Sequence, residues 1–162
     1  MDFRLVTAIR QNHALEHATI TLLASARGPR TVLAGRAGAD GFYLYGDVPT
    51  EAVADAAGEA LARLQKGEVD LAVSPFCGTS LATAGVLAGL GAVIAVGSKN
   101  RLQRLPQALT AAFFGVLIAQ PLGRLVQKHF TTSADLANLR IEGITRAGWG
   151  RWTVHKVKTA LI

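Results

Sequence analysis

The sequence contains a single cysteine, Cys77, so no disulfide can form within the chain. Aromatic residues make up only 6% of the sequence, and neither an aromatic-interleaved basic motif nor a helix-turn-helix pattern is present. The net charge is nevertheless +6, with the excess in residues 99–104 and 124–162. We therefore expect the basic groups to attract anionic lipid head groups, and we expect no nucleic-acid partner.

Charge is missing from two long stretches, residues 71–98 and 105–123. A membrane-spanning helix needs roughly 20 mostly apolar residues, and a charge at mid-bilayer costs roughly 2.5–3.5 kcal/mol on insertion scales. We therefore predict a transmembrane hairpin with spans over 79–98 and 105–127. The alternative is that the apolar pair forms a buried soluble core or a dimer interface.

The remaining segments predict a soluble part that precedes and follows this hairpin, over residues 1–78 and 129–162. Apolar periodicity predicts helices over 2–25 and from Thr50 to Gly67. Alternation and turn residues predict strands over 31–34, 42–45, 69–73, 139–147 and 151–158. Because a hairpin returns the chain to its starting side, the C-terminal strands can join the N-terminal sheet. The fold class is thus α+β, a small α/β domain of two helices and about five strands, and the chain (1–162) is one domain.

Local signals also predict how these elements end and pack. Gly28-Pro29 should end the first helix, Pro75-Phe76 should break the third strand, and Gly148-Trp149-Gly150 should join the last two strands. Thr79 or Ser80 should cap the first span, and Pro121 should kink the second. Gly85 and Gly89 have the small-xxx-small spacing that lets membrane helices approach closely, so we expect them to face the second span.

The first helix carries the most specific motif, His13, Glu16 and His17, which matches the H-x-x-E-H form of zinc peptidases. Histidines four residues apart lie on one helix face, where one metal can bridge both imidazoles. Steps of about 100° per residue place the motif in one sector with apolar residues that should be buried: Leu5, Val6, Ile9, Ile20 and Leu23. We therefore expect the motif to point inward, toward Cys77 and the C-terminal strands.

A catalytic zinc usually has three protein ligands and one open position. Cys77 is the first candidate for the third ligand, and His155 is the second. Glu16 would then be the general base for a metal-bound water, and Asn12 or a backbone carbonyl would orient an imidazole. Two alternatives remain open: a hydrogen-bonded polar network without metal, and a Cys77–histidine catalytic pair. Whether the protein is an enzyme is left undecided by the sequence.

Three segments carry a resemblance to a known family: "RQNHALEHATI", "GFYLYGDVPTE" and "PFCGTSLATAG". Over residues 8–128 the chain resembles an uncharacterised family of small bacterial two-span membrane proteins, known only as a domain of unknown function. The resemblance implies a membrane protein with no known activity. It supports testing His13, Glu16, His17 and Cys77 together.

The expected location is the bacterial cytoplasmic membrane, with the bilayer as partner and a homo-oligomer or another membrane protein as further possibilities. Basic residues flank both ends of the spans: Lys99, Arg101 and Arg104 in the loop, and Arg124 and Lys128 at the other end. The positive-inside rule therefore does not decide the orientation. Arg4 and Arg10 interrupt any apolar signal region, so we expect the soluble part to stay cytoplasmic.

Overall fold

The computed structural model describes residues 3–28, 31–74, 77–97, 101–149 and 152–162. The chain forms two compact units. The α+β unit comprises Met1–Ser74 and Lys128–Ile162, and the helical hairpin comprises Pro75–Gln127. The predicted break at Pro75-Phe76 and the predicted roles of Pro29, Lys99 and Gly150 fall on residues outside the described ones.

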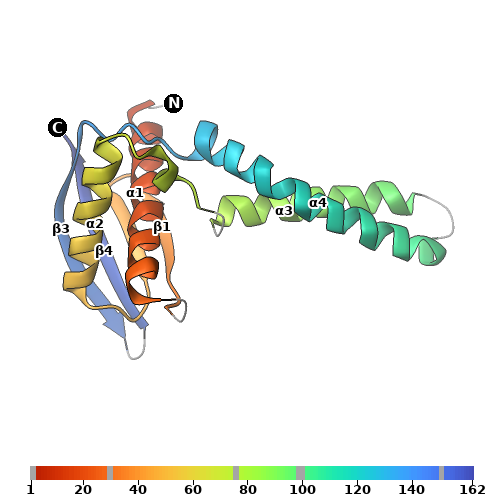
Figure 1. The fold of residues 1–162 in the computed structure, drawn as a ribbon, viewed down its shortest axis with the longest axis horizontal. Helices are drawn as coiled ribbons and strands as arrows, with labels where there is room; N and C mark the ends of the chain where they lie inside the picture. Colours follow the sequence, from red (N-terminus) through yellow and green to blue (C-terminus); the bar gives the residue numbers. More distant parts are fainter. Residues whose placement is uncertain (1–2, 29–30, 75–76, 98–100, 150–151) are drawn as a thin grey trace. The chain divides into compact units, whose positions relative to one another are not determined.

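A four-stranded antiparallel sheet forms one layer of the α+β unit (Figure 1). Its strands are β1 (Ala34–Gly38), β2 (Gly41–Tyr45), β3 (Leu139–Trp149) and β4 (Trp152–Leu161). The order β1-β2-β4-β3 places the C-terminal β4 directly beside β2, with Phe42 opposite Val157. The prediction that the C-terminal strands join the N-terminal sheet is therefore confirmed.

The second layer consists of helices α1 (Phe3–Arg27) and α2 (Thr50–Gln65), which lie side by side on one face of the sheet (Figure 1). The α2 helix buries one apolar stripe, as its spacing predicts. The residues buried between the layers include Leu15, Leu23, Phe42, Leu44, Val53, Leu64 and Val157. Gly28 follows α1 with a φ of 86°, a left-handed conformation that ends helices and favours glycine.

The α+β class is confirmed, but the described residues contain four strands and not five. Residues 69–72 form a 3-10 helix, η1 (Val69–Ala72), where a strand was expected. This short segment packs against α1, and the side chain of His17 bonds the carbonyl oxygen of Ala72 at 2.9 Å. Tertiary contacts to α1 thus decide the conformation, which alternating apolar residues alone do not fix.

The first strand also begins later than predicted, at Ala34 instead of Thr31. Gly38 pairs with Gly41, so Ala39 and Asp40 form a two-residue turn. Gly35, which follows the first predicted strand (31–34), instead lies inside β1. At this position it provides space for a side chain of α1.

The predicted buried face of α1 is only partly correct. Leu23 is buried, but Leu5, Val6 and Ile9 are exposed. Conversely, Ala14 and Ala18, which are not among the residues predicted to be buried, are fully buried. The reason is that the middle of α1 is covered by more than one neighbour, since it contacts α2, η1 and both N-terminal strands.

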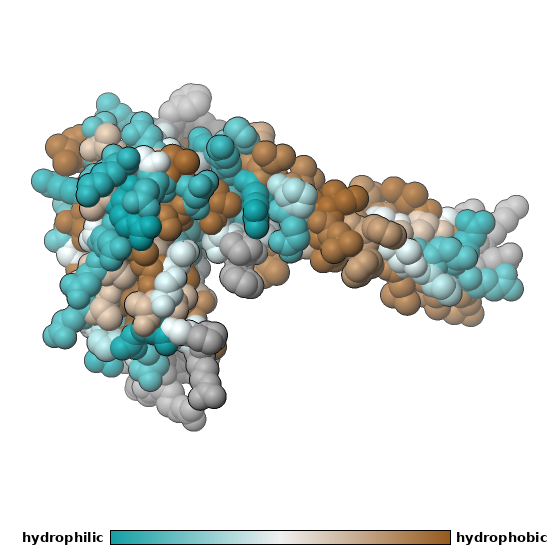
Figure 2. All heavy atoms as spheres, in the orientation of Figure 1, coloured by the Kyte–Doolittle hydropathy of each residue, from teal (hydrophilic) through white to brown (hydrophobic). Residues whose placement is uncertain are grey.

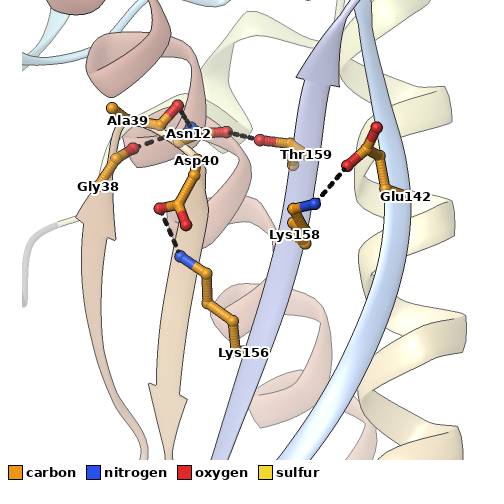
Figure 3. Close-up of polar contacts among 8 residues, drawn as sticks. All are labelled: Asn12, Gly38, Ala39, Asp40, Glu142, Lys156, Lys158 and Thr159. Carbon is orange, nitrogen blue, oxygen red and sulfur yellow. Dashed lines mark hydrogen bonds and ion pairs between the residues drawn. The ribbon is translucent and has the colours of Figure 1, made fainter.

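A buried asparagine ties α1 to both halves of the sheet (Figure 3). The side-chain amide of Asn12 donates to the carbonyl oxygens of Gly38 at 2.9 Å and Ala39 at 3.2 Å. Its amide oxygen accepts a hydrogen bond of 2.6 Å from the hydroxyl of Thr159. The residue expected to orient a histidine is therefore a structural link between α1, the β1–β2 turn and β4.

The helical hairpin consists of α3 (Gly78–Val96) and α4 (Leu105–Val126), joined through the 3-10 turn η2 (Arg101–Arg104). The two helices contact each other along their length (Figure 1). Close approach occurs at Gly115 and Gly91, where an added Cβ would lie 2.7 Å from the Leu87 oxygen and 2.9 Å from the Ala111 oxygen. Gly85 and Gly89 have no atom within 4 Å of such a Cβ, so the prediction that they face the second span is wrong.

Two polar side chains near the first and last residues of the hairpin form a hydrogen bond with each other. The side-chain amide of Gln127 donates to the Ser80 hydroxyl at 2.6 Å, close to Gly123. The cap of α3 is Cys77, whose sulfur accepts from the Thr79 amide at 3.4 Å, and not Thr79 or Ser80 as predicted. The α4 helix continues through Pro121.

Large apolar side chains cover the outside of the hairpin (Figure 2). Two helical segments, Gly78–Val96 and Leu102–Thr131, are long and apolar enough to cross a membrane. Only 6% and 17% of their most apolar windows are buried. The core helix of a soluble protein would be mostly buried, whereas these windows are mostly uncovered.

Candidate metal centre in the α+β unit

Two histidines of α1 lie together on one side of the helix. The ring centroids of His13 and His17 are 4.4 Å apart, with the rings inclined by 60°. His17 is buried, with 3% of its surface exposed, and His13 is half-buried. This agrees with the spacing of the motif, because side chains at positions i and i+4 of a helix are neighbours.

Backbone carbonyls fix the orientation of both rings. Nδ1 of His13 lies 2.9 Å from the Thr131 oxygen, and Nδ1 of His17 lies 2.9 Å from the Ala72 oxygen. A carbonyl oxygen only accepts hydrogen bonds, so Nδ1 must carry the proton in each ring. A neutral ring then has its lone pair on Nε2, which is the arrangement that metal-ligating histidines normally adopt.

Arg10 holds in place the segment that contains the Thr131 carbonyl group. Its Nη2 donates to the carbonyl oxygens of His129 and Thr132, each at 2.9 Å. The Arg10 carbonyl oxygen in turn accepts from the backbone amide of Ser133 at 3.0 Å. The only sequence signal for this role is position, because Arg10 lies three residues before His13 and therefore on a neighbouring part of the same helix surface.

Glu16, the predicted base, lies against β1. It is buried, with 5% of its surface exposed. A Cβ built at Gly35 would overlap its carboxyl group, so the glycine in β1 leaves the space that this side chain fills. The carboxyl group therefore packs beside the sheet backbone. Its predicted role as a base stays a prediction.

Cys77 belongs to the helical hairpin, where its sulfur caps α3. It is buried, and as the single cysteine of the sequence it forms no disulfide within the chain. The chain connects it to the α+β unit through only four residues after Ala72, the residue whose carbonyl bonds His17. The thiolate is the form of a cysteine side chain that binds metals.

His155, the second candidate for the third ligand, lies elsewhere in the α+β unit. It is fully buried on β4, and its Nε2 is 3.1 Å from the Thr50 hydroxyl at the start of α2. Its Nδ1 has no hydrogen-bond partner among the described residues. Burial, together with the positive charge of Arg146, lowers the pKa of His155 below its usual value of about 6.5.

The lowered pKa of His155 predicts that acid weakens the fold. In the unfolded chain this imidazole binds a proton as the pH falls through about 6.5, whereas in the folded chain it stays neutral to a lower pH. Its contribution to stability is therefore complete above about pH 6.5 and is lost progressively as the pH falls toward the folded-state pKa. We expect the urea midpoint of the purified protein to decrease between pH 7.5 and pH 5.5.

The matched variant for this measurement is His155→Gln, which keeps a polar side chain that does not titrate. Its urea midpoint should change less between the two pH values, even if it is lower at both. An unchanged pH dependence in His155→Gln would assign the effect to other groups. Measurements in the presence of a chelator remove any contribution from metal release at His13 and His17.

The fold and the histidine pair define a class of protein: a two-layer α+β unit joined to an apolar helical hairpin, with a paired-imidazole motif on its first helix. Residues 8–144 match the family model described as Domain of unknown function (DUF6391). The chain belongs to this family, which confirms the resemblance to a domain of unknown function. That its members span the membrane twice stays a prediction.

A relative from Picosynechococcus sp. (strain ATCC 27264 / PCC 7002 / PR-6) supports the same assignment. That protein is named only as uncharacterised, and it is 36% identical over 149 residues. The match covers 84% of this chain and 71% of the relative. No solved structure matches the chain.

Proposed function

We propose that this protein is an integral membrane protein that binds a metal ion through His13, His17 and Cys77, a donor set that suits zinc. The observation that carries the proposal is the pair of Nδ1 contacts to the carbonyl oxygens of Thr131 and Ala72. Two rings 4.4 Å apart with the same fixed tautomer direct two nitrogen lone pairs to one region. A hydrogen-bonded network without metal would not require the same tautomer in both rings.

Cys77 is proposed as the third ligand because the chain keeps it near His17. Ala72 is held by His17, and the sulfur follows five residues later. Two imidazoles and a thiolate make a donor set that could hold a metal ion. Zinc accepts both nitrogen and sulfur ligands, and three protein ligands leave its fourth position open.

The membrane part of the proposal is supported by the uncovered apolar surface of the hairpin. Exposed side chains such as Leu90, Phe113 and Ile118 would be costly in water, whereas lipid solvates them. The bacterial cytoplasmic membrane and a cytoplasmic α+β unit are proposed from the sequence. A second copy of this chain or another membrane protein is the further partner proposed.

An open metal position would allow hydrolysis, with Glu16 as the base. A second candidate is a non-enzymatic membrane subunit or assembly factor. The packing of Glu16 against Gly35 favours this second candidate, because a carboxyl group that fills a space beside β1 supports the fold. Among the described residues, the group that could hold a metal ion consists of His13, His17 and Cys77. It includes neither Glu16 nor His155.

Metal analysis after purification in a mild detergent tests the site. We expect about one zinc per chain in the unaltered protein, because the ligands form one three-donor site. His13→Ala, His17→Ala and Cys77→Ser should each lose most of it. His129→Ala is the matched control, because this exposed histidine lies outside the proposed ligand set. It should keep the metal.

Cobalt substitution separates the third ligand from the histidine pair. A thiolate–cobalt charge-transfer band in the near ultraviolet is expected in the unaltered protein and should disappear in Cys77→Ser. Metal-free protein under these conditions, with His13→Ala and His17→Ala reducing only the stability, would contradict the proposal. That result would assign the cluster to the structural polar network.

A further inference from the structure

A patch of exposed apolar side chains lies on the α+β unit at the beginning of α1. It consists of Leu5, Val6 and Ile9 on α1, with 51%, 39% and 37% of their surfaces exposed, and of Phe130 in the π-helical turn η3 (Gln127–Thr131), with 74% exposed. We refer to these four residues as the interfacial patch. Three large apolar residues within five positions of one helix differ from single exposed side chains, which are ordinary on protein surfaces.

The two segments of the patch belong to one surface. Arg10 of α1 bonds the carbonyl oxygens of His129 and Thr132, and His13 bonds that of Thr131. These contacts hold residues 129–132 along α1, one turn away from Val6 and Ile9. Steps of about 100° per residue place Leu5, Val6 and Ile9 within one sector of the helix, next to the side that carries Arg10 and His13.

The same surface is where the chain leaves the α+β unit for the helical hairpin. Lys128 is the first residue of the unit after α4, and Phe130 follows two residues later. On the other connection, Ala72 is held to α1 by His17, and Ser74 is the last residue before the hairpin. Covalent continuity therefore keeps Phe130 within a few residues of the second proposed span.

The charges around the patch fit anionic lipid head groups. Arg4 and Lys128 are exposed, and no acidic residue occurs from 3 to 15 or from 123 to 134. Apolar side chains flanked by cations are typical of helices that lie in the membrane interface, and each cation near an anionic surface contributes about 1 kcal/mol. A protein partner that covered the patch would not require basic residues alone around it.

We propose that the interfacial patch inserts into the boundary between head groups and acyl chains of the same membrane that the hairpin crosses. This inference rests on the proposed membrane function. The patch makes the beginning of α1 a third membrane contact. It thereby holds the His13–His17 pair, one to two turns further along the helix, close to the lipid surface.

Site-specific fluorescence quenching of the full chain tests this inference. Single cysteines at Val6, Ile9 and Phe130 are introduced into a Cys77→Ser background and labelled with an environment-sensitive dye. The protein is reconstituted into vesicles of phosphatidylethanolamine and phosphatidylglycerol. Val32→Cys is the matched control, because Val32 is also an exposed apolar residue of the α+β unit, with 85% of its surface exposed, but lies outside the patch.

We expect a lipid-attached quencher placed near the head groups to quench the three patch labels several-fold more than the label at Val32. Aqueous iodide should quench them several-fold less. Patch labels that behave like the Val32 label would overturn the inference. Labels protected from both quenchers would also overturn it, because protection from lipid and water indicates that a protein covers the patch.

Labels at Leu90 and Phe113 distinguish failure of this inference from failure of the membrane proposal. If deep lipid quenchers reach these hairpin positions and only the patch labels remain in water, the hairpin crosses the membrane and the patch inference alone is wrong. If the hairpin labels also remain in water, the proposed membrane function is wrong and the inference is overturned with it. Replacing phosphatidylglycerol by a neutral lipid should weaken quenching at the patch and leave that at Leu90 unchanged.

Discussion

Gly115→Ala is expected to destabilise the helical hairpin by about 1–3 kcal/mol, the usual cost of overpacking a close contact. The added Cβ would lie 2.7 Å from the carbonyl oxygen of Leu87 and 2.9 Å from the Cα of Ala88. Both are backbone atoms, so no flexible side chain can turn away. The two helices must move apart, and contacts along α3 and α4 are lost with that movement.

Gly89→Ala is the matched control in the same hairpin. It makes the same chemical change at a position with no atom within 4 Å of the new Cβ. Alanine is a better helix former than glycine by up to about 1 kcal/mol in water, so this variant should be neutral or slightly more stable. The comparison therefore isolates helix–helix contact from helix propensity.

Energy transfer between dyes provides the measurement for both variants. Dyes are attached to cysteines at Leu81 and Leu125, two exposed positions near the paired Ser80 and Gln127, in a Cys77→Ser background. The protein in mild detergent micelles is titrated with sodium dodecyl sulfate. A lower midpoint for Gly115→Ala and an unchanged or higher one for Gly89→Ala are expected. Equal midpoints would contradict the close contact at Gly115.

The hairpin also illustrates which part of the fold the sequence predicts. The absence of charge over long stretches predicts two long apolar helices, and the structure contains them. Spacing alone does not fix which glycines meet. The hairpin contains several glycines, and the rotation of each helix about its axis selects Gly91, Gly115 and Gly123 and leaves Gly85 and Gly89 uncovered.

In the candidate site, too, the sequence predicts a feature of one helix but not the contacts with distant parts of the chain. The proximity of His13 and His17 is a property of one helix and can be predicted from their spacing. Their orientation depends on carbonyl groups of Ala72 and Thr131, which are 55 and 118 residues away in the chain. Backbone groups carry no sequence signal, so these partners could not be predicted. The burial of Glu16 beside Gly35 likewise depends on tertiary packing.

Asn12→Leu is expected to destabilise the α+β unit by about 2–4 kcal/mol, on the basis of about 0.5–1.5 kcal/mol for each of three lost hydrogen bonds. Leucine has a similar size, so the variant removes the bonds to Gly38, Ala39 and Thr159 without creating a large cavity. The Thr159 hydroxyl is itself buried. It would lose its acceptor where water cannot replace it, which is the costly case.

Two further variants separate the polarity of Asn12 from its size. Asn12→Asp keeps an acceptor for Thr159 but places a carboxylate oxygen, in place of the amide donor, against the carbonyl oxygens of Gly38 and Ala39. It should be at least as destabilising as Asn12→Leu at pH 7, because a buried charge facing acceptors has no compensating donor. Thr159→Val removes only one of the three bonds and should cost about 1 kcal/mol.

Urea unfolding of the full chain in micelles, followed by tryptophan fluorescence, measures all three variants. Trp149 and Trp152 both belong to the α+β unit, so their signal reports on this unit and not on the hairpin. The expected order of midpoints is unaltered protein, Thr159→Val, Asn12→Leu and then Asn12→Asp at or below it. If Asn12→Leu were as stable as the unaltered protein, apolar packing alone would hold α1 on the sheet. The β1–β2 turn and β4 would then not depend on the Asn12 amide.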